Sequence, residues 1–261
     1  MTYTSLLAPM AAAAHEVGEY LAGVPRPTAP AAATLEELAA VHRAVEEPAV
    51  AIVRRHLDAL LPGVPWDASA DAGLPAGDVW VVDVIDGAVQ FLRGLPNFCV
   101  SLALVRDGEP VAAALHAPLP GETYLAAAGR GATRNGRAIA PSAGVRPEAA
   151  LVGTSQPSFL GGQPGVAAAA GRALAAVLPA VGAVRNLGPT SWQIADTAAG
   201  RLDAFWEYGR DDANLLPGAL VAREAGVVVT DTTGRPWRAG APGFLAAPRG
   251  LHGTLLELLE P

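Results

Sequence analysis

Two aspartates separated by two residues, Asp83 and Asp86, are the side chains of this chain best suited to acid–base or metal chemistry. They end the apolar run 79–82, which predicts a buried strand, and Gly87 follows them as a turn residue. Two carboxylates this close raise each other's pKa unless a cation or hydrogen-bond donors sit between them. The pair indicates either a chemical site or an Asx turn whose acids are solvated.

Strands and helices alternate around this pair, which indicates an α/β protein built of stacked layers. Thr34 is a suitable N-cap for a long amphipathic helix that ends near residue 61. We further expect helices over 4–22, 165–178, 190–199, 214–225 and 251–259, and strands over 79–83, 98–105, 110–116, 122–127 and 203–207, with another near 149. Residues 129–144 predict turns.

Composition excludes several classes of protein. The 261 residues carry a net charge of −7, and all 18 basic residues are arginines, so no basic face for nucleic acid is expected. The single cysteine, Cys99, cannot form an internal disulfide and is expected in the core. Because neither a signal peptide nor a membrane span is evident, we expect a cytoplasmic protein with no membrane partner.

The stretch 80–99, WVVDVIDGAVQFLRGLPNFC, resembles the signature of the inositol monophosphatase superfamily, which also includes fructose-1,6-bisphosphatases and 3′-nucleotidase-like proteins. Val84 replaces the usual proline of that signature, Ala88 its threonine and Gln90 its asparagine. The resemblance continues through 185–188, 198–209 and 217–231 and covers roughly residues 35–250. The matching signature residues are Trp80, Val81, Val82, Asp83, Ile85, Asp86, Gly87, Phe91, Gly94 and Pro96.

The resemblance implies a layered α-β-α-β-α sandwich. We expect an N-terminal α+β half over 1–147, which carries the two aspartates, and a C-terminal α/β half over 148–261. Together they would form one compact unit of catalytic type. Members of the family are commonly dimers, so we expect a homodimer or a heterodimer with a partner protein.

The resemblance also implies a chemistry. In the family, water activated between divalent cations, usually Mg²⁺, hydrolyses a phosphate monoester. The ligands are a loop glutamate, both aspartates of the motif, the main-chain carbonyl between them and an aspartate that opens a late helix. Here the resemblance places Asp83, Asp86, the Ile85 carbonyl and Asn214 at four of these positions.

Several of these positions differ from the family pattern. Asn214 replaces the late aspartate, His42 stands where a supporting acid is usual, and Ala88 lacks the hydroxyl that orients water. The loop glutamate falls near Ser69 or Ala70. The carboxylates that would rescue a metal site are Asp67, Asp71, Asp211 and Asp212. We therefore expect a vestigial metal set and no cofactor, with Mg²⁺ as the alternative.

An anion site would survive these losses. Gly87, Ala88 and the following amides begin a helix and would offer N–H groups to a phosphate or sulfate, with Asn214 beside them. Asp83 or Asp86 would then act as a general base. His42 is a second titratable candidate or a structural residue, and Arg93 either assists the anion or is solvated.

Three functions compete on these grounds. The favoured one is a family member repurposed in a specialised biosynthetic pathway, in which an internal nucleophile displaces a phosphate or sulfate group from a small-molecule ester without metal. The second is a non-catalytic subunit of a dimeric complex. The third is a Mg²⁺-dependent phosphomonoesterase with relocated ligands, so enzymatic activity is favoured but left open.

Overall fold

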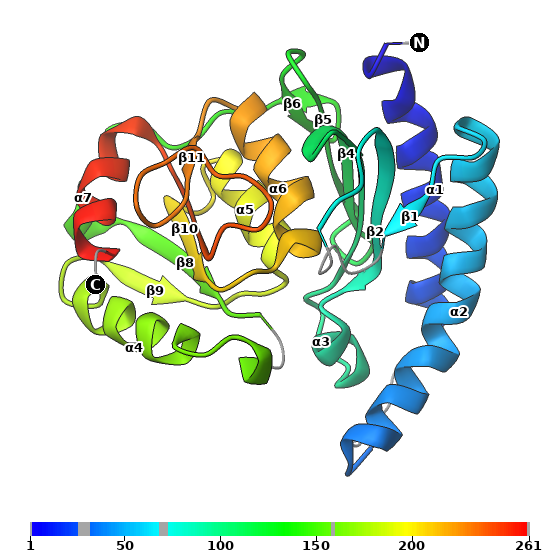
Figure 1. The fold of residues 1–261 in the computed structure, drawn as a ribbon, viewed down its shortest axis with the longest axis horizontal. Coiled ribbons are helices and arrows are strands. Elements are labelled where there is room, and N and C mark those ends of the chain that lie inside the picture. Colours follow the sequence, from blue (N-terminus) through cyan, green and yellow to red (C-terminus); the bar gives the residue numbers. More distant parts are fainter. Residues whose placement is uncertain (1, 26–31, 68–72, 158–159, 260–261) are drawn as a thin grey trace.

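The computed structural model describes residues 2–25, 32–67, 73–157 and 160–259 (Figure 1). The α-helices are α1 Thr4–Gly23, α2 Leu35–Leu60, α3 Ala88–Leu92, α4 Val166–Val177, α5 Thr190–Ala198, α6 Asp212–Glu224 and α7 Arg249–Leu259. The strands are β1 Trp66–Asp67, β2 Asp78–Asp86, β3 Cys99–Arg106, β4 Glu109–Ala117, β5 Glu122–Ala127, β6 Ala132–Arg134, β7 Arg137–Ala138, β8 Leu151–Ser155, β9 Ala183–Arg185, β10 Ala204–Tyr208, β11 Val228–Thr230 and β12 Gly243–Ala247.

The elements stack in five layers (Figure 1). Helices α1 and α2 cover one face of a seven-stranded sheet of order β1-β2-β3-β4-β5-β6-β7, antiparallel except for the β1–β2 pair. Helices α5 and α6 separate it from a five-stranded sheet of order β11-β12-β10-β8-β9, and α4 and α7 cover the far side. The predicted layered α/β class is confirmed. The two-half division at residues 147 and 148 stays a prediction.

Strand β2 is buried on both faces, which explains its uninterrupted apolar run. Val79 and Val81 point into the core shared with α5 and α6. Trp80 and Val82 point into the core beneath α1 and α2. The pairing of β2 with β3 shifts register between Asp83 and Asp86, so the strand bends where its two acids lie.

Local capping agrees with the prediction for α2. Thr34 Oγ1 accepts a hydrogen bond from Glu37 N at 3.2 Å, and the Glu37 carboxylate accepts one from Thr34 N at 3.1 Å. This reciprocal capping box satisfies two amides that the first helical turn leaves unpaired. Among the described residues, no helix is both long enough and apolar enough to cross a membrane.

Two elements differ from expectation. The stretch 129–144, predicted as turns, contains the short β6–β7 hairpin. Helix α6 begins at Asp212 and not at Asn214, because the Asp211 carbonyl already accepts hydrogen bonds from Asn214 N and Leu215 N at 3.0 and 2.9 Å. Asp211 is therefore the N-cap residue, and Asn214 lies in the first turn.

A pair of histidines lies where α1 packs on the seven-stranded sheet. The rings of His15 and His116 are 4.3 Å apart, and both contact the Thr123 hydroxyl, at 2.8 and 3.0 Å. Burial lowers the pKa of His116 to about 4, and the neighbouring His15 contributes to the lowering. His116 is therefore neutral in the folded protein near neutral pH.

We predict that acid destabilises the protein through His116. Since its pKa is lower in the folded chain than in the unfolded one, its contribution is complete above pH 6.5 and is lost as the pH falls towards 4. After allowance for solvent screening, the expected loss in unfolding free energy is about 2 kcal/mol. Urea unfolding between pH 7 and 4.5 measures it. The slope against pH should flatten in His116→Gln, and an unchanged slope would refute the assignment.

Candidate active site

A cavity of about 340 Å³ opens at the carboxyl end of β2 and is lined by residues of both sheets. The end of β2, the start of α3, the end of β8, the loop before α5 and the start of α6 all contribute to its wall. The residues that line it are Asp83, Ile85, Asp86, Gly87, Ala88, Val89, Gln90, Ser155, Gln156, Asn186, Gly188, Pro189, Thr190, Asp211 and Asn214.

Asp83 enters this cavity from the bent end of β2. Its Oδ1 accepts a hydrogen bond from Ile85 N at 2.9 Å, which closes a tight turn on the strand end. Burial raises the pKa of Asp83 to about 6, and the charges of Glu46 and Asp211 add to the effect. The carboxylate therefore lies in a region of negative potential.

Asp86 is held by a residue of α5, in the helical layer between the two sheets. Ser191, the second residue of α5, donates to Asp86 Oδ2 from its amide at 3.3 Å and also from its hydroxyl through a very short hydrogen bond. The Cys99 thiol lies 3.8 Å from the same oxygen. Burial and then the charge of Asp83 raise the pKa of Asp86 well above its usual value.

Asp211 brings a third carboxylate to the cavity. Asn214 Nδ2 donates to Asp211 Oδ1 at 2.8 Å. The loop before Asp211 is clamped by Gln163, which donates to the Arg210 carbonyl at 3.0 Å and accepts from Arg210 N at 2.6 Å. Two hydrogen bonds on one residue leave that loop little freedom, so the position of Asp211 is well defined.

Glu207 lies fully buried on β10 behind the cavity wall. Burial, followed by the charge of Asp211, raises the pKa of Glu207 well above its usual value. Thr190 links it to the wall, because its hydroxyl lies 3.3 Å from Glu207 Oε2 and 2.9 Å from Ser155 Oγ. Among the described residues, Glu207 Oε1 and Asn214 Oδ1 are buried without a hydrogen-bond partner.

Gly87 is required at the turn that follows the aspartates. Its φ of 90° is left-handed, and an added Cβ would lie 2.7 Å from the Asn97 carbonyl oxygen. Gly87 and Ala88 line the cavity, but α3 continues for only five residues, so its dipole is small. The predicted role of these amides in anion binding stays a prediction.

The predicted site residues divide into two groups. Asp83, Asp86 and Asn214 line one cavity. His42 pairs with Glu46 at 3.5 Å on α2 and is not part of the lining, while Arg93 caps the end of α3 and is exposed. The positions expected for the loop glutamate, Ser69 and Ala70, fall outside what the structure describes, as do the substitute Asp71 and the side chain of Asp67.

Sequence reasoning did not identify Ser191, Thr190 and Glu207 as parts of the site, and it identified Asp211 only as a possible substitute. Glu207 had a visible signal, since it is an acid inside the apolar strand AFWEY. The two hydroxyls of Thr190 and Ser191 had none, because Ser191 reaches Asp86 across 105 positions of the chain.

The comparisons with known proteins agree with this geometry. The model of the inositol monophosphatase family matches residues 30–261. This chain belongs to the inositol monophosphatase family. The resemblance inferred from the motif around Asp83 and Asp86 is confirmed.

Individual relatives cover much of the chain. Nus factor SuhB of Pseudomonas aeruginosa is 34% identical over 195 residues, which are 74% of this chain and 72% of that protein. An inositol-1-monophosphatase of Rhizobium meliloti is 37% identical over 164 residues, 62% of this chain and 60% of the relative. The SuhB structure from Bartonella henselae superposes with a TM-score of 0.80 at 26% identity and covers 97% of both chains. The Anabaena inositol monophosphatase has the same fold, with a TM-score of 0.80, 24% identity and coverage of 98% and 95%.

Family membership corrects the expectation that no cofactor is needed. Homologues in this family are Mg²⁺-dependent phosphatases. The cavity supplies a physical reason for the correction: its lining contains three carboxylates and, among the described residues, no arginine or histidine. A phosphate placed there is repelled unless cations lie between it and the carboxylates.

The donor chemistry of the site fits such an ion. Mg²⁺ prefers hard oxygen ligands, and the cavity offers Asp83, Asp86, Asp211 and the carbonyl of Ile85, with the buried, unpartnered Asn214 Oδ1 beside them. Within the described ranges, no three acidic, histidine or cysteine side chains already converge as a complete ligand set. The cavity therefore fits Mg²⁺ in the type and the charge of its donor atoms.

We predict that Ser191 is needed to hold Asp86. Ser191→Ala leaves a buried carboxyl group without its strongest donor, and the free energy of unfolding should fall by about 1–3 kcal/mol. Ser101→Ala is the matched control, because Ser101 is also buried and its hydroxyl has no hydrogen-bond partner in the described part of the chain. Urea unfolding compares the two variants, and equal losses would contradict the assignment.

Proposed function

We propose that this protein is a Mg²⁺-dependent phosphomonoesterase in which Asp211 supplies the carboxylate that the family pattern places at Asn214. The observation that supports it most directly is the presence of Asp83, Asp86 and Asp211 in one cavity. Asn214 Nδ2 donates a hydrogen bond to Asp211 Oδ1 there, at 2.8 Å. One helical turn separates positions 211 and 214, so either can present an oxygen to the same cavity. The site would thus keep three carboxylates despite the change at 214.

The residues of the chain would divide the work as follows. Asp83, Asp86, Asp211 and the Ile85 carbonyl hold Mg²⁺, which supplies Lewis-acid stabilisation of phosphoryl oxygens and activates water when bound. Ser191 keeps Asp86 oriented through two hydrogen bonds. Because Ala88 carries no hydroxyl, it does not orient the water.

The substrate we propose is a phosphate monoester of a small polyhydroxylated molecule. Besides Asn214, three amide side chains, Gln90, Gln156 and Asn186, line the cavity and offer both donors and acceptors to hydroxyl groups. A relative from Thermotoga maritima, 30% identical over 183 residues, is named fructose-1,6-bisphosphatase/inositol-1-monophosphatase. These two observations support cyclitol and sugar phosphates as the first compounds to assay.

Other predictions about function are narrower and remain untested. These are a role in specialised biosynthesis with displacement by an internal nucleophile, action on a sulfate ester, a non-catalytic subunit role, and a homodimeric or heterodimeric state. They differ from the proposal in one measurable respect: only the phosphomonoesterase releases inorganic phosphate in a Mg²⁺-dependent reaction with water.

We predict that Asp211→Asn lowers kcat/KM at least 100-fold for hydrolysis of inositol 1-phosphate or fructose 1,6-bisphosphate. The reason is that removing one of three anionic ligands weakens the attraction of the site for Mg²⁺, which prefers carboxylate oxygens. Phosphate release at several Mg²⁺ concentrations measures the effect. Asp58→Asn, a change of the same chemistry on the exposed side of α2, serves as the control and should match wild type.

A double variant makes the test specific to the proposed relocation. Asp211→Asn/Asn214→Asp restores a carboxylate at the position of the family pattern and should recover much of the activity. Recovery in the double variant supports the proposal. Full activity in Asp211→Asn alone, or no Mg²⁺-dependent hydrolysis of either ester by wild type, would overturn it.

A further inference from the structure

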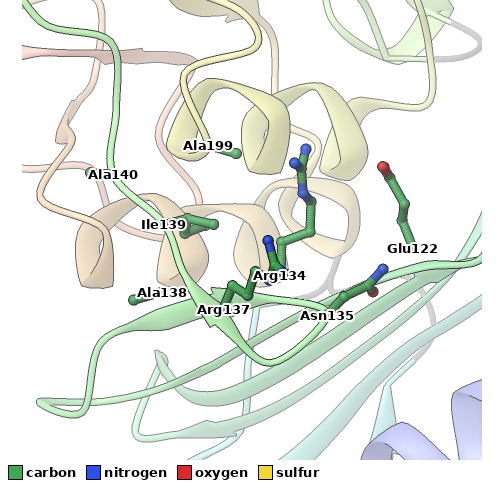
Figure 2. A pocket seen from close by; sticks show the side chains of 8 residues that line it. All are labelled: Glu122, Arg134, Asn135, Arg137, Ala138, Ile139, Ala140 and Ala199. Atoms are coloured by element: carbon green, nitrogen blue, oxygen red, sulfur yellow. The ribbon is translucent and has the colours of Figure 1, made fainter.

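A second cavity, of about 430 Å³, lies against the edge of the seven-stranded sheet, at the end of α5 opposite the acidic cavity (Figure 2). Its wall combines the start of β5, the β6–β7 hairpin, the segment after it and the residue that ends α5. The lining residues are Glu122, Arg134, Asn135, Arg137, Ala138, Ile139, Ala140 and Ala199. Its volume lies in the range of small-molecule pockets.

The hairpin places two arginines on one face of this wall. Arg134 and Arg137 are directly paired across β6 and β7, and opposed residues of an antiparallel pair project to the same side. The turn between them has φ values of 49° at Asn135 and 74° at Gly136, as a two-residue hairpin of this kind requires. Like charges directly opposite each other are destabilising, and an anion bound between the two guanidinium groups would remove this repulsion.

The carboxylates nearby are already engaged. Arg201 Nη1 lies 2.6 Å from Glu122 Oε2 and 3.1 Å from Asp196 Oδ1. Asp196 also accepts a hydrogen bond from the Tyr124 hydroxyl at 2.7 Å. Figure 2 shows Arg134 and Glu122 rising from the sheet towards the level of Ala199.

The charges of the lining do not balance. Arg134 and Arg137 share this wall with one carboxylate, Glu122, and that carboxylate is already paired with Arg201. Among the described residues, no hydrogen bond or ion pair occupies the exposed side chain of Arg137. Arginine binds phosphate through parallel N–H donors, often in bidentate geometry.

We infer that this cavity binds the phosphate group of a small molecule between Arg134 and Arg137. It is separate from the acidic cavity, because α5 spans nine residues, or about 13 Å, between Thr190 at one site and Ala199 at the other. The inference does not rest on the proposed function. The shared chemistry is a phosphate dianion, either free or carried by an organic ester.

Calorimetry with inorganic phosphate and with glycerol 3-phosphate tests the inference, in EDTA so that no divalent ion recruits phosphate to the acidic cavity. Wild type should bind, and Arg137→Ala should weaken binding at least tenfold. Arg130→Ala is the matched control, because Arg130 is an exposed arginine that precedes the first residue of β6, whereas Arg134 is its last. This variant should bind phosphate as wild type does.

Thermal unfolding in phosphate-free buffer verifies that Arg137→Ala is folded. The midpoint temperature of this variant should equal or exceed that of wild type, because one of the two opposed charges is gone. Equal affinity for both probes would assign the cavity to free phosphate, and tighter binding of glycerol 3-phosphate would assign it to an ester. The inference is overturned if wild type binds neither probe at concentrations up to about 10 mM, beyond the millimolar Kd of a weak ligand. Equal binding by Arg137→Ala would overturn it as well.

Discussion

Repulsion among buried carboxylates governs the acidic cavity. Asp83, Asp86 and Asp211 share one space, and burial raises the pKa of Asp83 and of Asp86. Burying like charges together costs free energy that the fold must offset elsewhere. It does so with the two hydrogen bonds that Ser191 donates to Asp86.

The rest of the architecture keeps these groups in place. Strand β2 is packed on both faces, so the backbone that ends in Asp83 and Asp86 is immobilised by two cores at once. Helix α5 supplies Ser191 from between the two sheets, and α6 begins at the residue after Asp211. The site therefore forms only where elements of both sheets meet, and no single segment of the chain contains it.

The local part of this arrangement was predictable from sequence. The motif around Asp83 and Asp86 is contiguous, and the strand and helix that carry it follow from apolar runs and a glycine turn. The contribution of position 211 was harder to predict, because the family pattern selects Asn214, while the start of α6 depends on which residue caps it. The contacts of Ser191 and Glu207 depend on how the two sheets pack, and no short-range pattern encodes them.

The two hydrogen bonds between Gln163 and the Arg210 backbone affect how the geometry of such a site can change during evolution. Gln163 is not part of the lining of the acidic cavity, yet its two hydrogen bonds help to determine where the loop that presents Asp211 lies. A substitution at Gln163 can therefore change the spacing of the carboxylates without replacing any of them. Homologous enzymes can acquire different ion preferences or turnover through residues that an inventory of ligands would pass over.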